Sequence, residues 1–261
     1  MTGAARAYLA WRRWNTAAGR ALAAVHTGVW LGLLDRADLH AVDQHEYGRR
    51  RVYHSDAHNL RGLFDWEERV LAEYFPRGGT LLVTGAGGGR EVVALSERGY
   101  RVLGFECNRE LVTVGRALLD RLDRRGAALC ETPRDLAPTV DGSADGVIVG
   151  WGSYMLIPDR ERRVAFLRGL RDPLVPDAPL LMSFFTREPR EWRARLVAAA
   201  ARVTRRGRRV ELGDDLAPNF VHRFTGPEIE SELRDGGFRP VVYRAEGSGP
   251  YDSGFAVGLA V

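Results

Sequence analysis

The amino-acid sequence predicts an α/β protein with a doubly wound, mostly parallel sheet. In residues 80–108 a short apolar run, a glycine cluster, a helical pattern and a second apolar run follow one another. Apolar runs alternate with helical patterns from there to the end of the chain. Strands that alternate with helices form a parallel sheet with helices on both faces.

The glycine cluster lies at the position where such a fold binds ligands. Residues 81–83 have the composition of a buried strand, and they are followed by Gly85, Gly87, Gly88 and Gly89. Glycine lets the backbone turn sharply and come close to a ligand, and the helix behind the turn presents free N–H groups. Glu106 ends the next strand, where its carboxylate can accept hydrogen bonds from two ribose hydroxyls. The stretch therefore predicts a site for a nucleoside-containing cofactor.

The spacing of the glycines distinguishes between cofactors. A dinucleotide-binding turn has the pattern G-x-G-x-x-G or A, and its third small residue would here be Arg90. The observed pattern is G-x-G-x-G, followed by a helix and by an acidic residue at the end of the second strand. On these features roughly residues 68–261 resemble the class I S-adenosylmethionine-dependent methyltransferases. The resemblance implies S-adenosyl-L-methionine as the cofactor.

The resemblance also implies which residues contact the cofactor. In the family a loop after the third strand lies against adenine, and its Asp-Leu pair aligns with Asp135 and Leu136. The family usually has an acidic residue two positions before the first glycine. This chain has Val83 there, so the contact to the methionine end must come from elsewhere. The expected cofactor contacts are Tyr53, Gly85, Ala86, Gly87, Gly89, Arg90, Glu106, Cys107, Asp135, Leu136 and Trp151.

The chain before the sheet begins with residues 4–34, whose Ala, Leu, Trp and Arg content predicts one or two helices. Gly28 and Gly32 are positions where a helix could break or end. We interpret this block as a cap over the open edge of the site, with a core helix as the alternative. The expected apolar face consists of Tyr8, Trp11, Trp14, Leu22, Val25 and Trp30.

Residues 40–66 contain four of the six histidines. His54 and His58 are four residues apart, which in a helix places them on one face, as in some metal sites. No cysteine accompanies them and they form no HExxH pattern, so we expect no metal. We predict instead that residues 47–58 form a lid beside the methyl acceptor, since polar aromatic and histidine-containing segments often do so in the family.

The rest of the chain supplies the remaining elements in order. Helices are predicted at residues 111–122, 159–170, 191–203 and 225–235, and strands at 127–130, 147–149, 180–185, 238–245 and 255–260. Thr225 and Glu228 have the spacing of a capping box at the start of the last helix. With the resemblance, this order implies a seven-stranded sheet with a reversed last strand, preceded by an N-terminal helical cap. The expected domains are a cap or lid over residues 1–66 and a methyltransferase domain over residues 67–261.

The function that the resemblance implies is methyl transfer to an oxygen or nitrogen nucleophile of a small molecule. Small residues at the end of the fourth strand leave room for the acceptor beside Trp151 and Tyr154. The N/D-P-P-Y tetrapeptide of adenine- and cytosine-amino methyltransferases is absent there, which argues against DNA base methylation. The candidate bases are His58, His54, Tyr154 and His222.

Other classes of protein stay open. An NAD(P)-dependent oxidoreductase would share the first strand, turn and acidic residue, and a non-catalytic protein could keep the same fold. An RNA methyltransferase would rest only on the arginine runs at residues 49–51 and 205–209, for which a solvated surface is the alternative. We therefore expect no nucleic-acid partner.

Composition narrows the setting. The chain has 261 residues, 45% of them hydrophobic and 28% charged, as in a globular protein with a substantial core. All 38 basic residues are arginine, and the net charge is only +4. There is no apolar run of about 18 residues, no signal peptide and no cysteine pattern, since Cys107 and Cys130 are isolated. We expect a cytoplasmic protein with no membrane partner, and the sequence does not indicate its oligomeric state.

Overall fold

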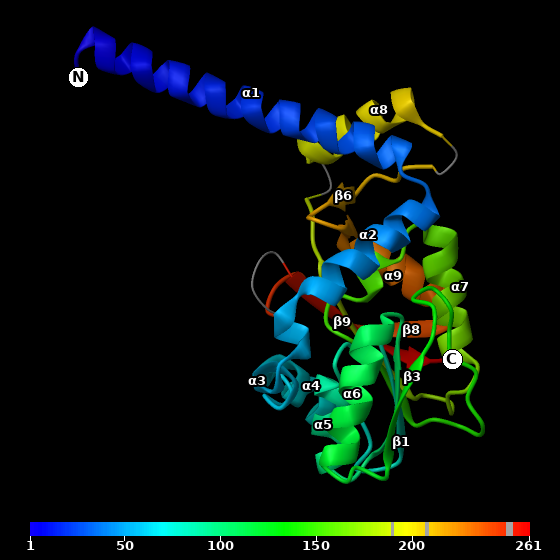
Figure 1. The fold of residues 1–261 in the computed structure, drawn as a ribbon. Helices are drawn as coiled ribbons and strands as arrows, with labels where there is room; N and C mark the ends of the chain where they lie inside the picture. The colour runs from blue at the N-terminus through cyan, green and yellow to red at the C-terminus, as the bar shows by residue number, and fades with distance from the viewer. Residues whose placement is uncertain (189–190, 207–208, 249–252) are drawn as a thin grey trace.

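The computed structural model describes residues 1–188, 191–206, 209–248 and 253–261, and it is built around a seven-stranded sheet (Figure 1). The strands are β1 (Thr80–Thr84), β2 (Arg101–Glu106), β3 (Ala127–Glu131), β4 (Gly146–Val149), β5 (Pro179–Phe185), β8 (Phe238–Arg244) and β9 (Ser253–Ala260). Their order is β3-β2-β1-β4-β5-β9-β8. Pairing is parallel from β3 to β5 and antiparallel on both sides of β9. The sheet thus has the predicted seven strands, and its last strand in sequence, β9, is the reversed one. The predicted sheet is confirmed.

Helices cover both faces of this sheet (Figure 1). One face carries α4 (Asp65–Tyr74), α5 (Arg90–Glu97) and α6 (Arg109–Arg121), and the other carries α7 (Arg160–Arg171) and α9 (Gly226–Asp235). Trp66, Val92 and Leu118 belong to the core under the first face, and Phe166 and Leu233 to the core under the second. The sheet therefore separates two apolar layers, as a doubly wound fold requires.

Local sequence explains where these elements end. Gly99 has a φ of +85°, which stops α5 before β2. The Asn108 side chain accepts hydrogen bonds from the first N–H groups of α6. Thr225 N donates to Glu228 Oε2 at 2.7 Å, and the predicted capping box is confirmed at the start of α9. Each helix and strand predicted after residue 80 is present in the structure.

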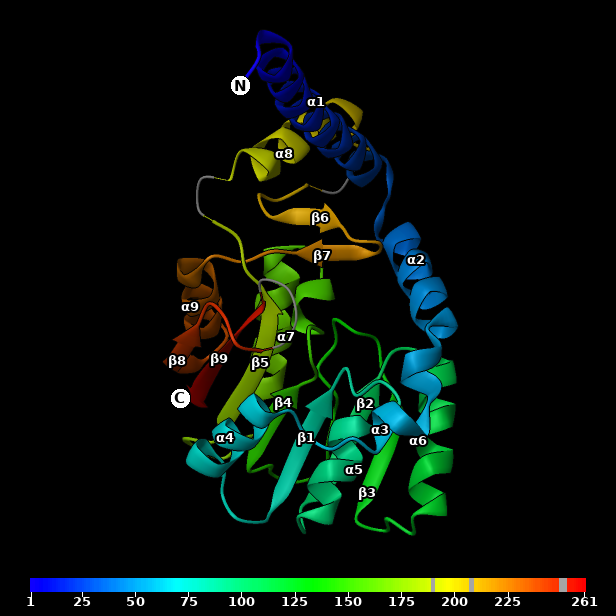
Figure 2. The same ribbon diagram turned by 90° about the vertical axis from the view of Figure 1, so that its left-hand side faces the viewer.

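A third layer lies at the carboxyl edge of the sheet (Figure 2). Its elements are α1 (Gly3–Leu33), α2 (Arg36–Arg49), η1 (Arg51–His54), α3 (Asp56–Asn59), η2 (Tyr154–Leu156), α8 (Trp192–Thr204), β6 (Asp214–Leu216) and β7 (Phe220–His222). Leu31 of α1, Val197 of α8 and Phe220 of β7 share a small apolar core. Helix α1, from the predicted cap of residues 1–66, thus packs against α8, from the predicted domain of residues 67–261. The division at residue 66 stays a prediction.

The predicted break at Gly28 is wrong, because α1 continues to Leu33, and the helix does end one residue after Gly32. A Cβ on Gly28 would lie 2.3 Å from the Val197 carbonyl oxygen, and one on Gly32 would lie 2.3 Å from Thr204 Oγ1. These glycines therefore allow α1 and α8 to approach closely. The expected apolar face is mostly exposed, with Trp14 at 69%, because α1 packs through its small residues instead. Figure 1 shows the N-terminal half of α1 extending away from the sheet.

This layer also contains the longest described helix, α1, and part of the arginine run at residues 205–209. Within the described ranges no single helix is long and apolar enough to cross a membrane, although α1 and α2 together meet that criterion despite the 115° bend between them. In the arginine run at residues 205–209, Gly207 and Arg208 lie outside the described residues.

Candidate functional site

The turn between β1 and α5 has the backbone geometry that its glycines predict. Gly85, Gly87 and Gly89 have φ values of +62°, +53° and +99°, in the region where a residue with a Cβ is strained. A Cβ on Gly88 would lie 2.3 Å from the Tyr53 carbonyl oxygen. The turn therefore needs glycine both for its own dihedral angles and for the close approach of η1.

Glu106, the predicted ribose ligand, lies beside this turn at the end of β2. Its Oε2 accepts a hydrogen bond from Gly87 N at 2.8 Å, and its Oε1 accepts from Cys107 N at 2.8 Å and from Asn108 N at 2.9 Å. The residue is 4% exposed. The carboxylate thus joins the glycine turn to the start of α6, and backbone N–H groups occupy both of its oxygens.

A cavity of about 430 Å³ lies between the glycine turn and the segment formed by η1 and α3. Tyr53 and His58 line it with their ring centroids 5.2 Å apart, and Trp151 lines it from the end of β4. Burial lowers the pKa of His58, and the nearby Arg90 guanidinium lowers it further. The cavity thus brings predicted residues from three separate stretches together: Tyr53, His58, Gly85, Ala86, Gly87, Arg90 and Trp151.

Arg90 follows the turn and is almost completely buried. Its guanidinium donates to both oxygens of Glu67, at 2.7 and 2.8 Å, and to Glu91 at 2.6 Å. Burial lowers the pKa of Arg90, but the Glu91 and Glu67 carboxylates more than offset this and raise it above its ordinary value. Arg90 therefore holds α4 against α5, a role that the glycine spacing alone could not reveal.

The space on the other side of Glu106 is filled by protein. The Arg134 guanidinium forms an ion pair with Asp43 of α2 at 2.5 Å and donates to Ser153 Oγ at 3.2 Å. Gln44 of α2 donates to the Cys107 carbonyl oxygen at 3.2 Å. The cavity lined by Gly85, Cys107 and Arg134 measures only about 10 Å³. A cavity of about 270 Å³ lies farther out, lined by Asp43, Arg134 and Asp135. It is therefore α2, and not α1, that lies over the ends of β2 and β3, and the Asp43–Arg134 pair that helps to hold it there is not predicted by the sequence.

Five predicted cofactor contacts do not line the 430 Å³ cavity: Gly89, Glu106, Cys107, Asp135 and Leu136. Asp135 forms an ion pair with Arg162 of α7, and Leu136 is exposed. Cys107 is half-buried under α2, and burial raises its pKa to about 12, which keeps the thiol neutral. Contact of these residues with a cofactor stays a prediction.

The structure does not bring the predicted catalytic side chains into one cavity. His58 lines the cavity at the glycine turn. Tyr154 is fully buried, its hydroxyl donates to Glu232 at 2.6 Å, and burial raises its pKa well above the ordinary value. His222 lies on β7 and lines a different cavity. Among these three side chains, His58 alone lies beside the glycine turn.

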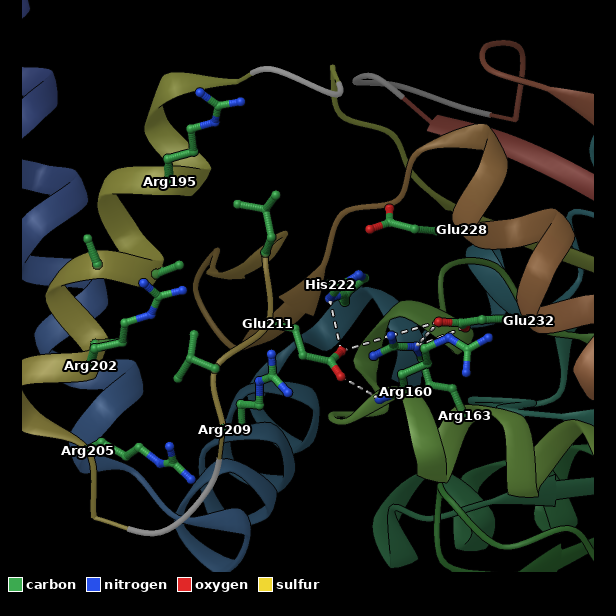
Figure 3. A pocket seen from close by; sticks show the side chains of 15 residues that line it. Arg160, Arg163, Arg195, Arg202, Arg205, Arg209, Glu211, His222, Glu228 and Glu232 are labelled. Carbon is green, nitrogen blue, oxygen red and sulfur yellow. Dashed lines mark hydrogen bonds and ion pairs between the residues drawn. The ribbon is translucent and has the colours of Figure 1, made fainter.

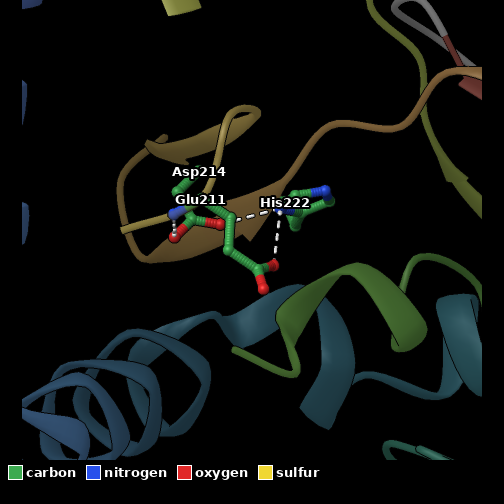
Figure 4. A group of neighbouring side chains, drawn as sticks. All are labelled: Glu211, Asp214 and His222. Atoms are coloured by element: carbon green, nitrogen blue, oxygen red, sulfur yellow. Dashed lines mark hydrogen bonds and ion pairs between the residues drawn. The ribbon is translucent and has the colours of Figure 1, made fainter. Parts of the chain in front are cut away.

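His222 belongs to a cluster with Glu211 and Asp214 (Figure 4). Its Nδ1 lies 2.7 Å from Asp214 Oδ1 and 3.9 Å from Glu211 Oε2. One imidazole and two carboxylates are donors that transition metals accept. Glu211, however, already accepts hydrogen bonds from Arg160 N at 2.9 Å and from an Arg163 guanidinium N–H at 3.0 Å. The cluster is thus an ion-paired network, and we assign no metal to it.

Comparisons with solved structures support the fold. No protein-family model and no curated protein matches the chain. Among solved structures, a SAM-dependent methyltransferase from Methanosarcina mazei matches at 20% identity and a TM-score of 0.60, covering 77% of this chain and 99% of that one. The 1,6-didemethyltoxoflavin-N1-methyltransferase of Burkholderia thailandensis matches at 18% and 0.60, covering 87% and 91%. The CcbJ methyltransferase of Streptomyces caelestis matches at 13% and 0.59, covering 82% and 98%. The chain has the class I methyltransferase fold.

Proposed function

We propose that this protein transfers the methyl group of S-adenosylmethionine to an oxygen or nitrogen atom of a small molecule. The observation that carries the proposal is the 2.8 Å hydrogen bond from Gly87 N to Glu106, which joins a G-x-G-x-G turn to an acidic strand end. Beside this turn lies a cavity of about 430 Å³, a volume in the range of small-molecule sites. The structure of the similar Burkholderia enzyme, which contains 1,6-didemethyltoxoflavin and S-adenosylhomocysteine, supports a small acceptor.

The residues fit this cofactor in part. A Cβ on Gly87 would meet no atom within 4 Å, so the cavity leaves room for a ligand directly over the turn. The ribose end is closed as the chain stands, because Glu106 is 4% exposed and α2 is held over the end of β2 by the hydrogen bond from Gln44 to the Cys107 carbonyl oxygen. Cofactor binding in this proposal therefore requires α2 to move away from Glu106.

In this proposal the residues of the chain align the acceptor, exclude water and remove a proton. The sulfonium of the cofactor supplies the leaving group for methyl transfer, so the protein must align the acceptor and exclude water. Trp151 forms a fixed wall, since its Nε1–H donates to the Ser248 carbonyl oxygen at 2.6 Å. His58 is the base in this proposal, because its lowered pKa keeps the imidazole neutral near pH 7 and able to accept the acceptor's proton.

The two alternatives differ in how well the structure supports them. A dinucleotide-binding sheet has the strand order 3-2-1-4-5-6 with parallel strands, whereas this sheet ends with the reversed β9 between β5 and β8. The structure therefore gives the oxidoreductase no support. The covered Glu106 carboxylate favours a non-catalytic protein of the same fold as the second candidate.

Calorimetric titration of the full chain separates these candidates. We expect micromolar or tighter binding of S-adenosylmethionine and no comparable binding of NAD. With a broad panel of hydroxyl and amine acceptors, we expect formation of S-adenosylhomocysteine above the rate without an acceptor. NAD binding without S-adenosylmethionine binding would contradict the proposal, and cofactor binding without turnover would favour the non-catalytic protein.

The lid predicted at residues 47–58 has a direct test. Tyr53 and His58 line the cavity, and lids belong to the less stable parts of a structure. We expect amide hydrogen exchange across residues 47–58 to slow when S-adenosylhomocysteine is added, while exchange in β9 stays unchanged. Unchanged exchange in the segment, with Tyr53→Phe and His58→Ala each costing less than twofold in turnover, would show that it is a permanently packed cap.

A further inference from the structure

A second cavity, of about 1000 Å³, lies between α7, α8 and the β6–β7 hairpin (Figure 3). It shares no lining residue with the cavity at the glycine turn. We call it the arginine cavity, because the residues that line it include Arg160, Arg163, Arg195, Arg202, Arg205 and Arg209. Ala198, Ala199 and Ala201 give it an aliphatic wall on α8. The established sequence motifs and the proposed methyl transfer make no use of this space.

The positive charge comes mainly from α8 and its carboxyl end. Arg195 and Arg202 are seven residues apart, about two helical turns, and so lie on one side of α8; Arg205 follows at its end. Figure 3 shows these side chains around the cavity. Within the described part of the chain, none of the three forms an ion pair with a carboxylate. Because neighbouring cations focus a positive potential in a recess, the recess attracts anions.

The carboxylates on the opposite wall do not neutralise these arginines. Glu232 pairs with Arg163 at 2.8 Å, and the same guanidinium pairs with Glu211 at 3.0 Å. Glu228 pairs with Arg187 at 2.5 Å. Each of the three acidic residues that line the cavity is therefore held by an arginine outside α8, and the charge on the α8 side is left for a ligand.

We propose that the arginine cavity binds an organic phosphate ester with an aliphatic body. Guanidinium groups bind phosphate through paired, charge-assisted hydrogen bonds, and the alanines between the arginines offer an apolar surface to the ester's carbon chain. The proposal does not depend on methyl transfer, because it concerns a separate cavity.

The lining argues against a nucleic acid as the occupant. Proteins that bind single strands combine a basic groove with aromatic side chains on which bases stack. The lining residues of the arginine cavity include no Phe, Tyr or Trp, and His222 is the one aromatic ring that they contain. A phosphate ester requires no such surface.

Titration of the full chain with hexyl phosphate tests the proposal. We expect hexyl phosphate to bind at least about tenfold more tightly than inorganic phosphate, from the burial of its alkyl chain, and hexylammonium not to bind. The double variant Arg202→Gln/Arg205→Gln should weaken hexyl phosphate binding by about tenfold or more, and Arg195→Gln should weaken it less. A second arm with phosphatidylcholine vesicles, with and without phosphatidic acid, distinguishes a lipid source from a soluble one.

The matched control is Arg69→Gln/Arg77→Gln, which removes the same charge at exposed positions outside the cavity. It should change the affinity less than twofold. Binding of S-adenosylmethionine and the thermal midpoint report whether each variant is folded. If the double variant is not folded, the single variant Arg195→Gln takes its place in the test. The proposal is overturned if hexyl phosphate and phosphatidic acid vesicles both fail to bind, if the cavity variants bind them as tightly as the unaltered chain, or if a single-stranded oligonucleotide is the only probe bound.

Discussion

Replacing Arg163 by methionine should lower the free energy of unfolding by about 3–5 kcal/mol, the cost of breaking a buried ion pair from one side. Arg163 and Glu232 are each 1% exposed and lie 2.8 Å apart. Methionine would keep much of the packing against Phe224, whose ring centroid lies 5.2 Å from the guanidinium carbon. It would leave the Glu232 carboxylate buried, and among the described residues the Tyr154 hydroxyl would be its remaining side-chain donor. Urea denaturation at pH 7 measures the loss.

Two controls separate this effect from general damage to the helices. Arg234→Met on α9 breaks an exposed pair with Glu230, and such pairs are worth about 0–1 kcal/mol. The double variant Arg163→Met/Glu232→Met removes both buried charges, so most of the lost stability should return. A loss below about 1 kcal/mol for the single variant would show that Glu232 finds water or another donor.

The sequence predicted the β1–α5–β2 unit because its signals are local. Residues 81–83 form a strand that is buried on both faces, Gly99 has the left-handed φ that ends α5, and Glu106 ends β2. Strand burial, helix stops and strand ends each depend on a few neighbouring residues. Local signals also predict the later strands in their order along the chain, and the resemblance predicts that they join one sheet.

Contacts between distant residues could not be predicted in this way. Arg134 and Asp43 pair across 91 positions of sequence, and neither belongs to a periodic pattern. Gly28 has the appearance of a helix breaker in sequence, but its role is set by α8, which lies far along the chain. The sequence therefore predicts the glycine turn and Glu106 of the candidate site. It does not predict that α2 lies over Glu106, because that contact depends on the tertiary structure.

Residue types alone also do not show how the three catalytic candidates differ. His58, Tyr154 and His222 are all chemically able to take a proton. Their surroundings differ, since His58 faces a cavity, Tyr154 is buried against Glu232, and His222 is held by Asp214. Burial and neighbouring charges decide which of them can act, and neither is visible in the sequence.

Gly87→Val should abolish S-adenosylmethionine binding, with a loss of at least about a hundredfold, or about 2.8 kcal/mol. Gly87 has a φ of +53°, which valine tolerates poorly because its side chain branches at Cβ. Its Cβ would also project into the open space over the turn, where a bound cofactor would lie. The backbone strain costs about 1–3 kcal/mol, within the stability of an ordinary domain, so we expect the variant to fold.

Calorimetry of Gly87→Val beside Gly126→Val checks this expectation. Gly126 lies before β3 at the other edge of the sheet, has no left-handed φ, and its added Cβ would come no closer than 4.0 Å to a neighbouring atom, the Tyr100 carbonyl oxygen. The Gly126→Val variant should therefore bind the cofactor as the unaltered chain does, and circular dichroism should show that both valine variants are folded. Gly87→Ala, with a smaller side chain at the same φ, should fall between the two. Unchanged binding by a folded Gly87→Val variant would mean that the cofactor does not lie on this turn, because a branched side chain cannot share the space that the ligand would fill.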